Sequence, residues 1–446
     1  MDDFPRAEVG QLIEAALDHL GDPGVVGPLN ALRERWLAWN PAQRRAFYAL
    51  LARLEIPQWP AAKVDLDDPA AVKKLTAARD ACESPRRQLL EQFVNLPGGI
   101  KFLVDLRADL RAGDRSSRGA DPDPALSLLE QDLLALLRSW FNFGFLTLAP
   151  IGWDRTPAAQ LERIMAQDTV HPMASWDDLR RRLDRDRLCY AFYHPNMPDE
   201  PIVFVEIALT RTIASSIDRL FTGPSVEKPD DATTAIFYSI NATQPGLAGV
   251  SLGNMLIKTV VAELQRRLPN LKRFSTLSPM PGFRDRFIAP LLAGKPAAKS
   301  QLQRDDLAQF FDKPDAATLT AAAAAPDLPT ALAHLLATDA WASDPALRLA
   351  LKPGLLRLAH HYLVNEKRGG EPVNPVASFH LKNGACLYNL NYLSNTAPKG
   401  MAESFGLTVN YHYDLKQIDA NREAARRGEV KTSPQLEKML KLGVSA

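Results

Sequence analysis

A glycine-flanked serine is the first group in this sequence with the spacing of a chemical motif. Residues 249–253 read Gly-Val-Ser-Leu-Gly. This matches the G-x-S-x-G pattern of serine hydrolases, with Ser251 as the candidate nucleophile. Such a nucleophile lies on a sharp turn between a strand and a helix. The preceding strand-like run ends near Ile240, too far from Ser251 for that turn, so the hydrolase interpretation is the weaker one.

The same stretch also has the pattern of a phosphate-binding loop. A strand-like run, a loop containing Gly246 and Gly249, and an amphipathic helix beginning near Leu252 follow one another. Glycines let a backbone approach a ligand closely, and the unpaired N–H groups at a helix N-terminus attract phosphate. Neither G-x-x-x-x-G-K-[ST] nor G-x-G-x-x-G occurs here, so an ATP or dinucleotide site is not indicated. An ordinary glycine loop at a helix cap stays an open alternative.

Two further polar residues occur where backbones are constrained. Ser278 follows the short strand-like run FSTL and precedes a segment with two prolines and Gly282. Prolines stiffen that segment, which would hold one hydroxyl in a fixed direction. His380 lies at the end of the strand-like run VASFHL, beside Asn383-Gly384, a pair typical of hairpin turns. A plain Ser-Pro turn and a structural histidine are the alternatives.

The elements that position these residues differ between the two halves of the chain. From about residue 7 to 185, apolar residues recur every three or four positions, which predicts helices and no strand. Residues 111–124 are expected to form a loop. From Cys189 onward, short β-rich runs predict strands, interrupted by a helix at 252–268 and a helical insertion at about 295–367. The sequence therefore predicts a helical bundle, used for packing or oligomerisation, followed by a mixed α+β domain.

Composition excludes several classes of protein. The 446 residues are 46% hydrophobic and 24% charged, with a formal net charge of +1, so no charged field points to nucleic acid or a membrane surface. Three separated cysteines favour a reduced compartment, and no metal-ligand spacing occurs. The acidic N-terminus and a C-terminus unlike S-K-L favour a cytoplasmic protein over a secreted or peroxisomal one. No apolar run is long enough to span a membrane.

Three long segments together resemble a known family. Gln244-Pro-Gly-Leu-Ala-Gly249 approximates the coenzyme A loop of the N-acetyltransferase superfamily, Q/R-x-x-G-x-G/A leading into a helix. The chain as a whole resembles the malonyl-CoA decarboxylase family. The segments that carry this resemblance are CYAFYHPNMPDEPIVFVEIALT, AIFYSINATQPGLAGVSLGNMLIKTVVAELQRRLPNLKRFSTLSPMPGF and NPVASFHLKNGACLYNLNYL.

The resemblance implies a fold, an activity and a set of site residues. The fold would be a two-domain one, with an all-α helical oligomerisation domain at 1–187 and an acetyltransferase-like (GNAT-like) α+β domain at 188–446. The activity would convert malonyl-CoA into acetyl-CoA and CO2 without a metal or organic cofactor, in a homo-oligomer such as a tetramer. Ser278 and His380 would be catalytic. The residues that would hold coenzyme A are Ala248, Gly249, Val250, Ser251, Leu252, Gly253 and Asn254. Some family members carry a glutamate where this chain has Ser251, so Ser251 is expected to cap the helix.

A mechanism with these groups has one open step. Loss of CO2 leaves an enolate that needs a proton. His380 is expected to donate it, because the unperturbed pKa of histidine is near neutral, while Ser278 fixes the geometry. The reverse assignment, with Ser278 delivering the proton, stays open. The alternative functions are a coenzyme A-dependent acyltransferase, a non-catalytic acyl-CoA-binding scaffold and a Ser251 esterase.

Overall fold

The computed structural model describes residues 4–20, 23–54, 73, 84–116, 123–224, 226, 228–250, 252–295, 300 and 302–442. The chain divides into two compact units. The first contains residues 1–149, 192–203 and 242–255, and the second contains residues 150–191, 204–241 and 256–446. Each unit is therefore assembled from separate stretches of sequence, and the domain boundary at residue 187 stays a prediction.

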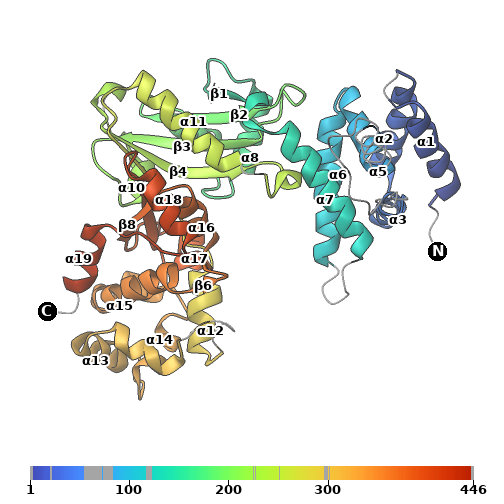
Figure 1. Ribbon diagram of the computed structural model, residues 1–446. Helices are drawn as coiled ribbons and strands as arrows, with labels where there is room; N and C mark the ends of the chain where they lie inside the picture. The colour runs from blue at the N-terminus through green and yellow to red at the C-terminus, as the bar shows by residue number, and fades with distance from the viewer. Residues whose placement is uncertain are drawn as a thin grey trace. The chain divides into compact units, whose positions relative to one another are not determined.

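Helices make up most of the first unit (Figure 1). They are α1 (Arg6–Asp18), α2 (Val26–Ala38), α3 (Pro41–Ala52), α5 (Pro85–Gln92), α6 (Gly99–Ser116) and α7 (Pro124–Trp140). Their apolar faces meet in one core that includes Phe47 and Leu103. Local signals set where helices begin: the Asn40 side chain accepts the N–H groups of Ala42 and Gln43 and so caps α3.

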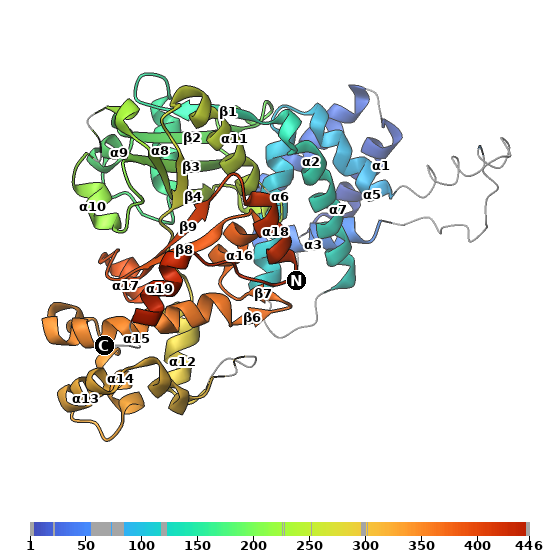
Figure 2. The ribbon, with the colours of Figure 1, turned by 60° about the vertical axis from the view of Figure 1, so that its left-hand side comes forward.

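A seven-stranded sheet has the order β1-β2-β3-β4-β5-β9-β8. Figure 2 shows β9 and β8 continuing the sheet beyond β4. The strands are β1 (Thr147–Ile151), β2 (Arg187–Tyr193), β3 (Val203–Thr210), β4 (Thr234–Ala242), β5 (Arg273–Thr276), β8 (Cys386–Asn391) and β9 (Thr408–Tyr413). Every residue of β3 is buried, which fits its almost continuous apolar run.

One crossover positions the residues of interest. Strands β4 and β5 are parallel and are joined through α11 (Leu252–Arg267). Strand β9 pairs antiparallel with β5, and β8 pairs antiparallel with β9. The order strand, loop and helix is the one that the predicted coenzyme A loop requires. The end of β5 consequently lies beside β9.

The remaining helices belong to the second unit. The predicted insertion is helical, and α13 (Lys313–Ala322) packs on both α14 (Leu328–Leu335) and α15 (Pro345–Val364) (Figure 1). A two-stranded sheet, β6 (Lys367–Arg368) with β7 (Glu371–Pro372), follows. The other helices are α8 (Ala158–Gln167), α9 (Trp176–Arg182), α10 (Ile217–Thr222), α12 (Ala289–Leu292), α16 (Pro375–Lys382), α17 (Pro398–Ser404), α18 (Ile418–Arg426) and α19 (Pro434–Leu442).

The predicted fold class, a helical region followed by a mixed α+β domain with a helical insertion, is confirmed, with three local corrections. Strand β1 lies in the region expected to lack strands; it is a short edge strand that contains Pro150, so its pattern is weak. Helix α6 continues to Ser116 into the expected loop, and residues 117–122 lie outside the described chain. The run VASFHL is part of helix α16 rather than a strand. No helix within the described ranges is long and apolar enough to cross a membrane.

Candidate functional site

Ser278 is held by backbone hydrogen bonds to strand β9. It lies just beyond the end of β5, as predicted. Its N–H donates to the Val409 carbonyl oxygen at 2.8 Å, and the Val409 N–H donates back at 2.9 Å. The chain then turns at Gly282, whose φ of +84° is in the left-handed region that favours glycine. The Ser278 side chain therefore starts from a fixed backbone position.

His380 lies in the last turn of helix α16, not at the end of a strand. The helix begins with Asn374, whose side chain accepts the Ala377 N–H at 2.8 Å, and with a proline at the first helical position. Asn383 and Gly384 end this helix instead of forming a hairpin, and the φ of +88° at Gly384 is typical of a helix C-terminus. The helix presents the imidazole of His380 toward β5 and β9.

The structure brings Ser278 and His380 together although 102 positions separate them. The Ser278 Oγ lies 3.3 Å from Nε2 of His380 and donates to the Thr276 Oγ1 at 2.9 Å. On the other side of the ring, the Tyr413 hydroxyl lies 2.7 Å from Nδ1 of His380. Tyr413, His380, Ser278 and Thr276 thus form a continuous hydrogen-bonded chain.

Burial sets the protonation of this chain. Ser278 is 5% exposed and His380 is 3% exposed. Loss of hydration disfavours the charged imidazolium and lowers the pKa of His380 to about 3. It also raises the pKa of the Tyr413 phenol. The imidazole is therefore neutral at physiological pH, and the pKa of His380 lies well below the unperturbed value on which its expected role as proton donor was based.

Two tyrosines that the sequence interpretation did not assign to the site complete it. Tyr411 stacks on the imidazole of His380, with ring centroids 4.7 Å apart. Tyr413 is two residues further along β9, and both rings contact His380. Residues i and i+2 of a strand point to the same face. The two-residue spacing of the tyrosines in NYHY was the sequence signal that could have placed both on one face. It identifies the site only once α16 is known to cover the strand.

The predicted coenzyme A loop lies between β4 and α11, in the first unit. Gly249 has a φ of +92°, and helix α11 begins at Leu252 and includes Gly253, as expected. Gly246 does not leave room for a ligand: a methyl group there would lie 1.8 Å from the Val104 carbonyl oxygen of α6. Ser251 lies outside the described residues, as does the side chain of Asn254. Ala248 and Val250 are in the described loop, and the role of the whole segment in binding stays a prediction.

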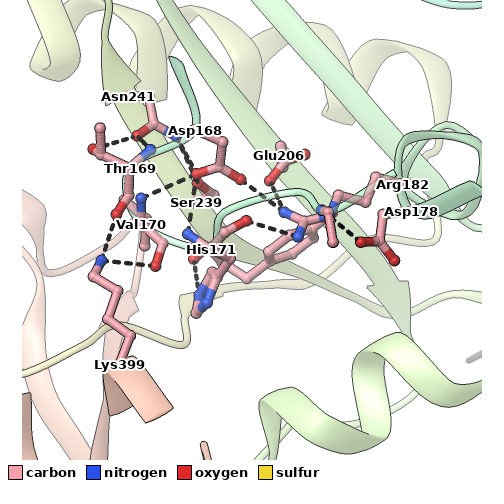
Figure 3. Close-up of polar contacts among 12 residues, drawn as sticks. Asp168, Thr169, Val170, His171, Asp178, Arg182, Glu206, Ser239, Asn241 and Lys399 are labelled. Atoms are coloured by element: carbon pink, nitrogen blue, oxygen red, sulfur yellow. Dashed lines mark hydrogen bonds and ion pairs between the residues drawn. The ribbon is translucent and has the colours of Figure 1, made fainter. Parts of the chain in front are cut away.

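A buried ionic cluster on β3 and β4 had no sequence signal (Figure 3). Asp168 Oδ1 accepts hydrogen bonds from Ser239 Oγ at 3.0 Å and Asn241 Nδ2 at 2.8 Å. Arg182 Nη1 lies 2.7 Å from Asp168 Oδ2 and 3.0 Å from Glu206 Oε2. One guanidinium therefore faces two carboxylates. Burial raises the pKa of Glu206 to about 8, more than the attraction of Arg182 lowers it. Through these hydrogen bonds and ion pairs, the cluster holds the segment after α8 against the sheet.

Glu206 is expected to make stability fall as pH rises above neutrality. Its ordinary pKa is 4.5, so between that value and about 8 the native state keeps a proton that the unfolded state has released. The contribution of Glu206 to the free energy of unfolding should therefore fall by about 1.6 kcal/mol between pH 6.5 and 8, because the slope of about 1.4 kcal/mol per pH unit halves as the pH reaches the native pKa. Histidines with lowered pKa values act in the opposite direction below and just above their ordinary value of 6.5, and they are common to the two proteins compared below. They are His171, His194, His360, His380 and His412.

Chemical denaturation of the wild type and of Glu206→Gln at pH 6.5, 7.25 and 8 measures this effect. Glutamine keeps an oxygen that can accept from Arg182 but carries no titrating proton. The free energy of unfolding of the wild type minus that of Glu206→Gln should fall by about 1.6 kcal/mol from pH 6.5 to 8. Equal slopes in the two proteins would show that Glu206 is ionised in the native state.

Comparisons with known proteins agree with one another. A family described as "Malonyl-CoA decarboxylase C-terminal domain" matches residues 144–445, and "Malonyl-CoA decarboxylase N-terminal domain" matches residues 58–141. The mitochondrial malonyl-CoA decarboxylase of Anser anser anser is 39% identical over 346 residues, which cover 76% of this chain and 66% of that protein. The enzyme of the same name from Rattus norvegicus is 37% identical over 343 residues, with coverages of 75% and 66%. This chain thus spans 66% of the length of these vertebrate relatives.

Solved bacterial structures match over nearly the full chain. The crystal structure of malonyl-CoA decarboxylase from Agrobacterium vitis superposes with a TM-score of 0.80 at 38% identity, and the match covers 97% of this chain and 99% of that one. The structure from Rhodopseudomonas palustris gives a TM-score of 0.77 at 36% identity with the same coverages.

Proposed function

Because this chain belongs to the malonyl-CoA decarboxylase family, we propose that it converts malonyl-CoA into acetyl-CoA and CO2. The observation that carries the proposal is the contact between Ser278 and His380, which lies among buried side chains at the end of β5. Those two residues are the proposed catalytic pair. The proposed chemistry takes all its groups from the protein and treats coenzyme A as part of the substrate.

Decarboxylation requires the enzyme to stabilise an enolate. When the malonyl carboxylate leaves as CO2, its electron pair moves to the α-carbon and the thioester oxygen. A site accelerates this step by interacting more strongly with that developing charge than with the substrate. Hydrogen-bond donors in a poorly hydrated site contribute most, each about 3 kcal/mol by analogy with oxyanion holes. Ser278 and His380 are buried, which supports their assignment to such a poorly hydrated site.

The enolate carbon then needs one proton, and a neutral imidazole can relay it. When the Tyr413 hydroxyl donates to Nδ1, the Nε2–H of His380 points at the Ser278 Oγ. We propose that Ser278 gives its hydroxyl proton to the α-carbon and regains one from Nε2, while Nδ1 takes the proton of Tyr413. The strongly basic phenolate that results recovers its proton from solvent. In this relay Ser278, and not His380, gives the proton directly to the α-carbon.

The relay predicts that activity does not follow the ordinary titration of histidine. Because the pKa of His380 in the free protein is about 3, its imidazole stays neutral as the pH rises from 5.5 to 8.5. The pH profile of kcat/KM, which reports the free enzyme, should therefore lack a limb with a midpoint near 6.5 that belongs to His380. Steady-state kinetics of the wild type and of His380→Asn over this pH range test this. A limb near 6.5 that disappears in His380→Asn would contradict the relay.

The remaining parts of the proposal concern binding and context. We propose that the coenzyme A portion contacts the loop from Ala248 to Asn254, since backbone N–H groups at the start of α11 can meet phosphate oxygens. Assembly into a homo-oligomer such as a tetramer, a cytoplasmic location and a role in fatty acid metabolism belong to the same proposal. The matched vertebrate enzymes carry the description mitochondrial, so location requires fractionation of the source cells, and light scattering measures the oligomer.

Product analysis separates this function from the alternatives. Incubation with malonyl-CoA alone should yield acetyl-CoA. An acyltransferase would need a second substrate and would release free coenzyme A, and an acyl-CoA-binding scaffold would leave malonyl-CoA intact. Formation of free coenzyme A without acetyl-CoA would overturn the proposed function.

A further inference from the structure

The helical first unit holds the glycine loop by direct contacts. The short turn at Pro245–Leu247 packs against α6 so closely that only glycine fits at position 246. Arg107 of α6, whose side chain is fully buried, donates from Nη1 to the Gly246 carbonyl oxygen. Helix α6 therefore fixes the path of the loop before it reaches α11.

A second arginine reaches the same loop from α7. Arg138 donates from Nε at 3.3 Å and from Nη2 at 3.2 Å to the Gly249 carbonyl oxygen. Both bonds are long and share one acceptor, and the side chain is exposed. No carboxylate in the described part of the chain pairs with this guanidinium. The guanidinium of Arg138 is thus held beside the loop, and its positive charge and remaining N–H donors are available to a ligand.

The charge around the loop is unbalanced. Arg107 Nη2 lies 2.6 Å and Arg111 Nη1 lies 2.9 Å from the same oxygen of Glu130. Both Arg111 and Arg138 are close enough to help lower the pKa of Arg107, after the larger effect of burial. These three arginines and Glu130 carry a net charge of +2, and Arg138 is the one that contacts the Gly249 carbonyl oxygen. A guanidinium is well suited to phosphate because its donors match two oxygens at once.

We propose that Arg138 binds a phosphate group of the acyl-CoA substrate, and that Arg107 is a positioning residue that holds the loop for this contact. The helical unit would then take part in substrate binding as well as in packing. This inference rests on the proposed function, because it takes coenzyme A as the ligand of the loop. Both the pyrophosphate and the 3′-phosphate of coenzyme A have the required chemistry.

The test compares Arg138→Gln and Arg138→Lys with the wild type. Arg45→Gln, which removes an exposed arginine on α3, is the matched control. Arg138→Gln should raise the KM for malonyl-CoA at least tenfold and leave kcat within threefold. Arg138→Lys should recover part of the loss, because it keeps the charge, and Arg45→Gln should match the wild type. The KM for malonyl-pantetheine, which has no phosphate, should be the same in all four proteins.

Malonyl-dephospho-CoA identifies the phosphate. If Arg138→Gln weakens this substrate as much as malonyl-CoA, the contact is with the pyrophosphate; if the effect vanishes, it is with the 3′-phosphate. A KM for malonyl-CoA within twofold of the wild type, or an equal increase with malonyl-pantetheine, would overturn the inference.

Calorimetric binding of coenzyme A keeps this inference separate from the proposed function. A protein that binds coenzyme A through Arg138 but makes no acetyl-CoA would contradict the decarboxylase proposal and support the Arg138 contact. A protein that makes acetyl-CoA with unchanged affinity in Arg138→Gln would do the reverse.

Discussion

Replacing His380 with asparagine is expected to lower kcat for malonyl-CoA by 10²- to 10⁴-fold, about the contribution of a positioned proton-transfer group. The variant loses the ring that joins Tyr413 Oη to Ser278 Oγ, at 2.7 and 3.3 Å. The relay is then broken, whereas the loop at 248–254 lies in the other compact unit. Steady-state kinetics should show the loss in kcat, and calorimetry should show nearly unchanged affinity for coenzyme A.

A control variant and a folding measurement show whether the loss of kcat in His380→Asn comes from the missing imidazole. His334→Asn changes an exposed histidine of α14 and should leave kcat unchanged. Thermal unfolding of His380→Asn reports whether the loss of a buried ring has unfolded the protein. A folded His380→Asn protein with near-normal kcat would remove His380 from the mechanism.

Replacing Ser278 with alanine is expected to lower kcat by about 10²- to 10³-fold, or about 3–4 kcal/mol. The hydroxyl is the group in the relay that would face substrate, and its backbone bonds to Val409 do not depend on the side chain. If Ser278 and His380 act as one unit, the double variant should be hardly slower than the slower single variant. Independent roles would instead multiply the two losses.

Ser378→Ala is the matched control for this series. Ser378 lies on the same helix as His380 and donates to Glu371 at 3.2 Å, outside the relay. Its kcat should stay within about twofold of the wild type, since surface substitutions rarely change the structure around them. A large loss in Ser378→Ala would mean that the kinetics report movement of α16 rather than chemistry at Ser278.

Local sequence signals predicted most strands of the large sheet, missed β1 and misassigned the segment that carries His380. The runs in β3 and β4 are apolar enough to identify a covered sheet. VASFHL looks like a strand because of its valine and phenylalanine, yet Asn374 and Pro375 ahead of it are a helix start. The helix-start signal outweighs the β-propensity of VASFHL in deciding its secondary structure. Because the segment is a helix, the imidazole of His380 points in a different direction from the one a strand would give it.

Other features depend on contacts between distant parts of the chain. The need for glycine at position 246 comes from Val104 on helix α6, whereas the sequence alone suggested that Gly246 lets the backbone approach a ligand. The low pKa of His380 follows from burial under residues of α16 and β9, which no local pattern reports. The cluster of Asp168, Arg182 and Glu206 joins three separate elements and could not be found by spacing.

The most direct measurement is the release of CO2 from malonyl-CoA as the sole substrate, with the wild type and the Ser278→Ala/His380→Asn double variant in parallel. We expect one CO2 and one acetyl-CoA per malonyl-CoA consumed by the wild type. We expect background rates for a folded double variant that still binds coenzyme A. Equal release by the two proteins would contradict it, and so would its absence from the wild type.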